Sequence, residues 1–75
     1  MSIAELKVGE IGQVIDVAQL DESFRRRLAD MGLNQGKRVK IQQKLPFAGP
    51  CILECEGIQL GLRHDDAQRI KVRVD

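Results

Sequence analysis

Few side chains of this chain could do chemistry, and they are scattered along it. His64 is the only histidine, and it stands beside Asp65 and Asp66. A histidine with neighbouring carboxylates can bind a divalent metal ion. Adjacent residues in one turn seldom converge on a metal without ligands from elsewhere, so we favour a solvated polar turn. Ser23 is explained better as a helix cap than as a nucleophile. The sequence contains no catalytic set and no phosphate-binding GxxxxGK[ST] loop.

The two cysteines, Cys51 and Cys55, are four residues apart in an apolar segment. On one strand they would share a face but lie about 13 Å apart, at ~3.3 Å per residue. A disulfide needs Cα atoms no more than roughly 7 Å apart, so a strand here excludes an intrachain bridge. One metal ion could not bind both sulfur atoms either. We expect two buried free thiols that pack as small apolar side chains.

An aromatic loop tip is the first candidate for binding a protein partner. Phe47 and Ala48 lie at the centre of the turn Pro46-Phe47-Ala48-Gly49-Pro50, in which Gly49 allows unusual dihedral angles. Aromatic anchors are favoured in binding hot spots. The alternative, which we marginally prefer, is that the loop folds over the end of the sheet and buries Phe47 in the core.

A basic run, Arg25-Arg26-Arg27, is the second candidate. On a helix, Asp21 with Arg25 and Glu22 with Arg26 are four residues apart, with the acid on the favourable N-terminal side. We therefore favour a charge-compensated helix surface. Arg25 and Arg26 remain candidates for contact with an acidic protein partner. A nucleic-acid site would need further basic residues on one face or aromatic side chains for base stacking.

Composition limits the possible classes of protein. Seventy-five residues with a hydrophobic fraction of 43% predict one globular domain over residues 1–75. The formal net charge of +1 creates no broad field that would attract nucleic acid or an anionic membrane. The first seven residues lack the apolar region of a signal peptide, and no run approaches the ~20 apolar residues that span a bilayer. We expect a soluble cytoplasmic protein.

One helix is predicted to follow the first strand, which is expected near residues 12–17. Leu20, Phe24, Leu28 and Met31 recur at helical spacing and define one apolar face. Asp21, Glu22 or Ser23 can cap its N-terminus. Gly32 suits the left-handed position after the last turn, and Leu33 would then fold back onto Leu28 in a Schellman-type stop.

Four further strands follow the helix. Alternation predicts a strand near residues 38–42. Further strands are expected near residues 51–55, 58–62 and 70–74, separated by a tight hairpin turn at Glu56-Gly57 and a polar turn at residues 64–68. We predict a mainly β fold with one inserted helix, closed as a small SH3-like antiparallel β-barrel. Its expected core residues are Val39, Ile41, Leu53, Leu60, Leu62, Ile70 and Val72.

Three segments, in this order and spacing, resemble the FeoA family, the small cytoplasmic accessory proteins of bacterial ferrous iron uptake. They are Leu28 to Gly36, the turn Pro46 to Pro50, and Leu60 to Val72. The sequence departs from the family at Gln35-Gly36, where the family tends to carry Pro-Gly, and this change should loosen the loop slightly. The resemblance also implies the SH3-like fold.

The resemblance implies an adaptor that is not an enzyme and needs no cofactor. Its implied partner is FeoB, the GTP-dependent membrane permease for Fe(II), which the chain would regulate or assemble through the permease's cytoplasmic region. Three alternatives stay open: a direct Fe(II)-binding regulator or carrier that uses His64, Asp65, Asp66 and Glu54; a regulatory module like the C-terminal domain of iron-dependent repressors; and a small RNA-binding barrel. The oligomeric state is open.

Overall fold

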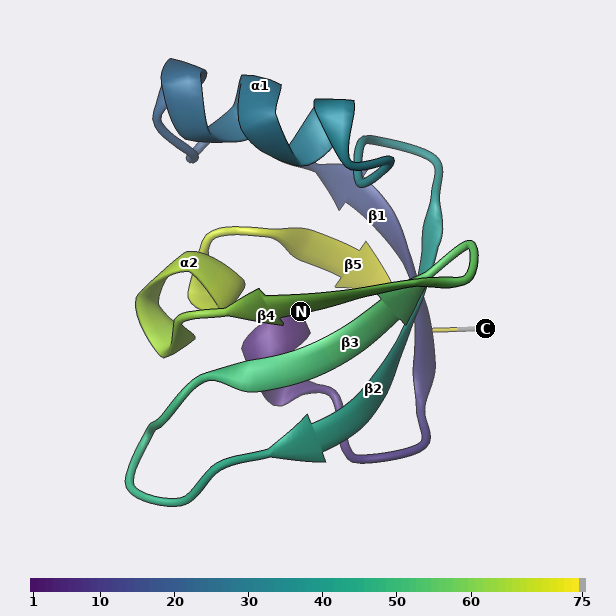
Figure 1. The fold of residues 1–75 in the computed structure, drawn as a ribbon, viewed down its shortest axis with the longest axis vertical. Helices are drawn as coiled ribbons and strands as arrows, with labels where there is room; N and C mark the ends of the chain where they lie inside the picture. The colour runs from purple at the N-terminus through teal and green to yellow at the C-terminus, as the bar shows by residue number, and fades with distance from the viewer. Residues whose placement is uncertain (75) are drawn as a thin grey trace.

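Five antiparallel strands form one curled sheet in the computed structural model, which describes residues 1–74 (Figure 1). The strand order is β4-β3-β2-β1-β5, and every pairing in it is antiparallel. The elements are, in chain order, the 3-10 helix η1 (Ile3–Glu5), β1 (Ile11–Asp16), α1 (Glu22–Asp30), β2 (Arg38–Lys44), β3 (Cys51–Cys55), β4 (Ile58–Leu62), α2 (His64–Gln68) and β5 (Lys71–Arg73).

The sheet curls without closing. The register shifts between Val14 and Asp16 in β1 and between Ile41 and Gln43 in β2, and such bulges increase the local twist. Strands β4 and β5 are the two edges, and within residues 1–74 no ladder joins them. The short helix α2 forms the connection between these edges (Figure 1). The predicted mainly β fold with one inserted helix is confirmed, with the barrel left open at this point.

Both ends of α1 follow from local sequence. At its start, the Asp21 carboxylate accepts a hydrogen bond from the Phe24 amide at 3.3 Å. At its end, Gly32 has φ +97° and donates to the Ala29 carbonyl at 3.0 Å, while the Leu33 amide donates to the Leu28 carbonyl at 2.9 Å. These are the two hydrogen bonds of a Schellman motif, as predicted.

The apolar face of α1 is shorter than predicted. Leu20 and Leu28 are buried and Phe24 is partly buried, but Met31 is 41% exposed. The expected contact of Met31 with the core is wrong because this residue is the C-cap, where φ −89° and ψ 2° end the helical spacing.

The core combines the predicted strand positions with an unpredicted N-terminal segment. All seven predicted core residues are buried, and Cys51 and Cys55 are buried free thiols, as expected. Ile3, the first residue of η1, and Leu6, its C-cap, are also fully buried. Hydrogen bonds from the Ile3 amide to the Ile70 carbonyl, 3.0 Å, and from the Val72 amide to the Met1 carbonyl, 2.8 Å, hold this segment against β5.

Some predicted boundaries change. The first strand begins at Ile11 rather than Gly12, and β5 is confined to Lys71–Arg73. The predicted polar turn at residues 64–68 is the helix α2, because Ala67 faces the core and is 1% exposed. No helix within the described residues is long and apolar enough to cross a membrane.

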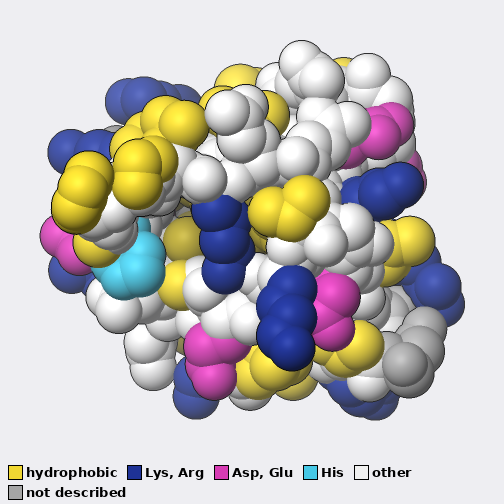
Figure 2. All heavy atoms as spheres, turned by 90° about the horizontal axis from the view of Figure 1, so that it is seen from below, with side chains coloured by type: hydrophobic (Ala, Val, Ile, Leu, Met, Phe, Trp, Pro, Cys, Tyr) yellow, Lys and Arg dark blue, Asp and Glu magenta, His cyan; other side chains and the backbone are white. Residues whose placement is uncertain are grey.

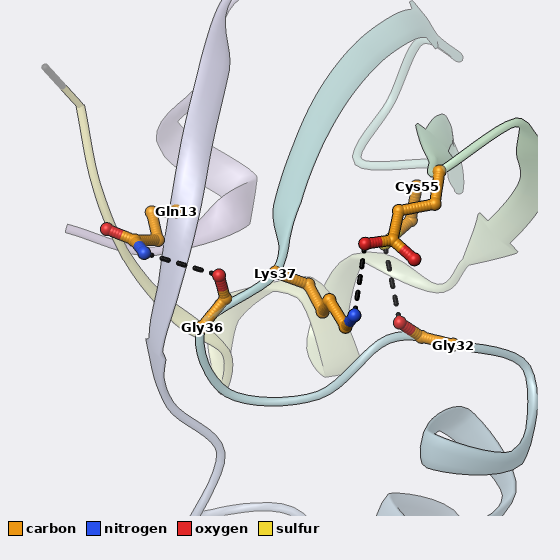
Figure 3. A network of polar contacts seen from close by, with 6 residues as sticks. Gln13, Gly32, Gly36, Lys37 and Cys55 are labelled. Atoms are coloured by element: carbon orange, nitrogen blue, oxygen red, sulfur yellow. Dashed lines mark hydrogen bonds and ion pairs between the residues drawn. The ribbon is translucent and has the colours of Figure 1, made fainter.

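Side-chain contacts fix the loop between α1 and β2 (Figure 3). The Gln13 amide donates to the Gly36 carbonyl at 3.2 Å, and Lys37 forms a 3.0 Å ion pair with Glu56. The Cys55 thiol donates to the Gly32 carbonyl at 3.5 Å. The loop that carries Gln35-Gly36 is therefore attached both to β1 and to the β3–β4 turn.

Candidate functional site

The hairpin loop between β2 and β3 has an unusual backbone. It is closed by hydrogen bonds from the Leu45 amide to the Pro50 carbonyl and from the Gly49 amide to the Pro46 carbonyl, both 3.1 Å. Its two central residues have positive φ, 60° at Phe47 and 55° at Ala48. Two left-handed residues in succession are typical of a type I′ turn, a position that Asn and Gly normally occupy.

Gly49 has a different role from the predicted one. Its φ is not positive, so the unusual dihedral angles fall on Phe47 and Ala48 instead. A Cβ atom at Gly49 would lie 3.0 Å from the Pro46 carbonyl oxygen and 3.1 Å from the Leu45 Cβ atom. The loop therefore needs glycine at this position for space.

Phe47 is the most exposed large apolar side chain of the described structure, at 98%. The marginally preferred alternative, in which Phe47 enters the core, is wrong. The two hydrogen bonds close the loop into a tight turn beyond the ends of β2 and β3, so the ring cannot reach the core. Ala48, the neighbouring candidate, is also exposed.

A cavity of about 190 Å³ lies beside this loop. Figure 2 shows it as a hollow floored by hydrophobic atoms, with the histidine and a basic side chain near its rim. The Lys44 ammonium group at this cavity donates to the Ala4 carbonyl at 2.8 Å. The lining comes from three separate parts of the chain: Ala4, Lys44, Leu45, Ala48, Gly49, Cys51, His64 and Ala67.

The cavity lining is mostly apolar in character. Burial raises the pKa of the Cys51 thiol, although the positive charge of Lys44 opposes that shift. The thiol is therefore protonated and uncharged at neutral pH and behaves as part of an apolar wall. Leu45, which is 40% exposed, extends this wall to the surface. The loop and the cavity together form an apolar site that could receive side chains of another protein.

The structure does not bring the four predicted partner-binding residues together. Phe47 and Ala48 are adjacent on the loop, whereas Arg25 and Arg26 lie on α1, at the opposite end of the molecule (Figure 1). Arg26 pairs with Glu22 at 3.1 Å on the exposed surface, as the charge-compensated interpretation predicts. The carboxylate of Asp21, the predicted partner of Arg25, instead caps the helix.

The candidate metal ligands are also dispersed. His64 lines the cavity, Asp65 is exposed, and the Asp66 carboxylate accepts a hydrogen bond from the Arg63 guanidinium at 3.3 Å. Glu54 lies on β3 and accepts from the Gln42 amide at 3.2 Å. In the part of the chain that the structure describes, no three His, Cys, Asp or Glu side chains are grouped so that they could hold a metal ion.

Sequence reasoning missed the cavity beside the β2–β3 loop. Its members Ala4, Cys51 and His64 belong to η1, β3 and α2, so no local spacing could reveal that they lie together. The two prolines around Phe47 indicated a turn, but they did not indicate which surface the turn would border.

Comparison with known proteins gives the family. A family model described as the FeoA domain matches residues 1–74. A protein of Porphyromonas gingivalis (strain ATCC BAA-308 / W83), described as an Fe(2+) transport protein A/Fe(2+) transporter FeoB fusion protein, is 28% identical over 74 residues. The match covers 99% of this chain and only 9% of the fusion protein, so the chain spans less than a tenth of that relative.

Solved structures show the same fold. The solution structure of a FeoA protein from Chlorobium tepidum is 35% identical, with a TM-score of 0.92 over 99% of this chain and 70% of that one. The crystal structure of an iron uptake regulatory protein (FeoA) is 26% identical, with a TM-score of 0.84 over 97% of this chain and 95% of the other.

A manganese-dependent transcriptional repressor is similar in fold alone. It is 21% identical, with a TM-score of 0.87 over all of this chain and 41% of the repressor. The predicted SH3-like fold class is confirmed by this likeness. With the family model matching from the first residue to residue 74, the chain belongs to the FeoA family.

Proposed function

We propose that this chain is a cytoplasmic accessory protein of ferrous iron uptake, which binds the cytoplasmic region of a FeoB-type, GTP-dependent Fe(II) permease and regulates or assembles it. In the Porphyromonas gingivalis relative, Fe(2+) transport protein A and the Fe(2+) transporter FeoB are fused in one polypeptide. This fusion supports association of the two parts. In a fusion, the linker keeps the two parts at high effective concentration. Where the two parts are separate polypeptides, the accessory part needs a binding surface of its own.

The observation that carries this proposal is the 98% exposed ring of Phe47 on a turn of two left-handed residues. Each such non-glycine residue costs about 1–2 kcal/mol, and the exposed ring adds no burial to offset that cost. Strained backbone of this kind is concentrated at functional sites. Because the turn is already formed, binding through Phe47 requires little further ordering of the loop.

The magnitude of the contact can be estimated. Burying a Phe side chain contributes about 1.5–3 kcal/mol, which corresponds to roughly a 10-fold to 150-fold change in Kd. The cavity beside the loop offers an apolar side chain of the partner a place to enter. Together they would form the centre of an interface, with the exposed polar residues around them as its rim.

The test is binding of the full chain to the cytoplasmic GTPase region of a ferrous permease from the same genome, with GTP analogue, with GDP and without nucleotide. Phe47→Ala should weaken the complex at least about tenfold without lowering the thermal unfolding midpoint. Ile58→Ala is the matched control, because Ile58 is a 47% exposed apolar residue on β4, paired with Cys55 at the end of β3 far from the loop. This control should bind like the wild type.

Two results would contradict the proposal. Equal loss of binding in both variants would mean that the loop is not the contact surface. Absence of binding in every nucleotide state would remove the cytoplasmic region as the partner.

The proposal includes no catalytic step and no cofactor. The Fe(II)-carrier alternative has less support, because His64, Asp65, Asp66 and Glu54 are not grouped as a metal site within residues 1–74. The repressor-like alternative rests on likeness of fold at 21% identity.

A further inference from the structure

A second surface groove, of about 430 Å³, lies between α1, the end of β4 and α2. We infer that this groove binds an acidic, extended segment of a protein partner. It is distinct from the apolar loop site: α1 is at one end of the molecule and the β2–β3 loop is at the other (Figure 1). The inference therefore does not depend on the proposed function.

Three arginines line the groove, and its two carboxylates already have partners within the protein. Arg27 comes from α1, while Arg63 and Arg69 flank α2. Asp21 caps α1 through the Phe24 amide. Asp66, whose side chain is 10% exposed, accepts from the Nε atom of Arg63. The acids of the groove thus already have hydrogen-bond partners within the protein, whereas all three arginines are exposed.

The guanidinium groups keep free donors. The Arg27 guanidinium lies over the Phe24 ring, 5.9 Å from its centroid, and stacking of this kind leaves the N–H groups at the edge available. Arg63 uses its Nε atom for Asp66, and its side chain is 85% exposed. No ion pair involves Arg69, which is exposed, in the described part of the chain. Arginine binds carboxylates through paired N–H donors, so this arrangement favours an anionic ligand.

The backbone at the groove favours an extended ligand. Strand β4 is an edge strand, and its exposed residue Gly61 lines the groove. A Cβ atom at Gly61 would meet only the Cδ1 atom of its cross-strand partner Ile52, at 3.7 Å, so the sheet face at this point of β4 is uncrowded. A free edge without a side chain allows another backbone to approach and pair, as in β-strand addition.

An acidic protein segment fits these features better than a nucleic acid does. Base stacking needs free aromatic faces, whereas Phe24 is partly buried and already covered by Arg27. The donors also come from α1 and from both ends of α2, which suits several carboxylates along a chain rather than one small anion.

The test uses the full chain and a labelled peptide that alternates glutamate with valine, measured by fluorescence anisotropy. The same peptide with glutamine in place of glutamate is the matched ligand control. Arg69→Gln and Arg27→Gln should each weaken binding about fivefold, the effect of losing one charge-assisted hydrogen bond. Arg26→Gln is the control variant, because Arg26 is on the same helix outside the groove and pairs with Glu22. It should bind within about twofold of the wild type.

Two further readouts give the location and the class of ligand. The amide resonance of Gly61 should shift on titration with the glutamate peptide, and binding should weaken between low and high salt. The inference is overturned if both groove variants bind like the wild type, or if the glutamine peptide binds equally well. It is also overturned if an oligonucleotide of equal charge binds more tightly, which would indicate an RNA site, or if equimolar inorganic phosphate displaces the peptide.

Discussion

The two turns at the ends of β3 adopt similar backbone conformations in different surroundings. In the β3–β4 turn, Glu56 and Gly57 have φ of 52° and 83°, and in the β2–β3 loop Phe47 and Ala48 have φ of 60° and 55°. Glu56 forms an ion pair with Lys37, and the thiol of the preceding Cys55 donates to Gly32 (Figure 3). The β3–β4 turn is therefore held by contacts with the α1–β2 loop.

The β2–β3 loop lacks comparable compensation. It has no glycine at either left-handed position, and its most prominent side chain is exposed to solvent. Both turns join two neighbouring strands, but only the β3–β4 turn also packs against the α1–β2 loop, through Lys37 and Gly32. The Phe47 ring on the other turn is 98% exposed, and for this reason we propose a partner for it.

Substituting the glycine of each turn by alanine should give the largest difference between the turns in the free energy of unfolding. Gly49→Ala should reduce the free energy of unfolding by about 2 kcal/mol, because the new Cβ atom would press on the Pro46 carbonyl and on Leu45. Gly57→Ala meets no atom within 4 Å and should cost about 1 kcal/mol through its left-handed backbone alone. Urea unfolding of both variants measures the difference. A larger loss in Gly57→Ala would contradict the steric argument.

Ala48→Gly should separate stability from binding. It relieves about 1–2 kcal/mol of backbone strain. The added conformational freedom of the unfolded chain costs about 0.5–1 kcal/mol, so the free energy of unfolding should rise by about 0–1.5 kcal/mol. Affinity for the permease region should fall, because the loop that presents Phe47 becomes more flexible. Urea unfolding and titration of the same preparation test both effects. Unchanged affinity would show that the shape of the loop is irrelevant to binding.

Glu56→Gly is the matched substitution at the other turn. It relieves similar strain but removes the ion pair with Lys37, so its net effect on the free energy of unfolding should be near zero. In high salt, where the Lys37–Glu56 ion pair of the wild type is screened, the Glu56→Gly variant should be more stable than the wild type. Stability of Ala48→Gly relative to the wild type should not depend on salt.

The thiols at the two ends of β3 should have the smallest effect on stability at neutral pH, and their effect should grow at higher pH. Burial raises the pKa of Cys51 and, with the help of the Glu56 charge, that of Cys55. Above the ordinary thiol pKa of about 8.5, the unfolded chain loses protons that the folded chain keeps, so stability should fall with rising pH, by at most about 1.4 kcal/mol per pH unit for each thiol.

Urea unfolding at a series of pH values from 7 to 10 measures this dependence. Cys51→Ala and Cys55→Ala should each flatten the curve above the ordinary thiol pKa, and neither should change its shape near pH 7. A curve that is equally steep in the double variant would assign the dependence to other groups.

Strand β2 was predictable because it alternates apolar and polar residues, and the later strands because turn residues separate them. The end of α1 was predictable because Gly32 permits the left-handed stop. The segment η1 was not, because three residues cannot display a period. Its role depends on contacts of Ile3 with β5, nearly seventy positions away in the chain.

The candidate site was less predictable than the fold. The sequence singled out Phe47, but burial or exposure of its ring depended on how tightly the turn closes. The cavity beside it depends on the packing of His64 against residues from β2 and β3, and the arginine groove depends on the position of α1 over the sheet edge. Tertiary placement of this kind leaves no local pattern.

The attachment of the first residues to β5 has a topological consequence. Ser2 forms a bridge with Lys71, and the Met1 carbonyl accepts from the Val72 amide, so the beginning of the fold lies beside its last strand. A unit whose first and last segments are neighbours can be inserted into a longer polypeptide, or have its order of segments permuted, with little disturbance of its interior. The same pairing means that residues added directly before Met1 would continue beside β5, where they could prolong the sheet.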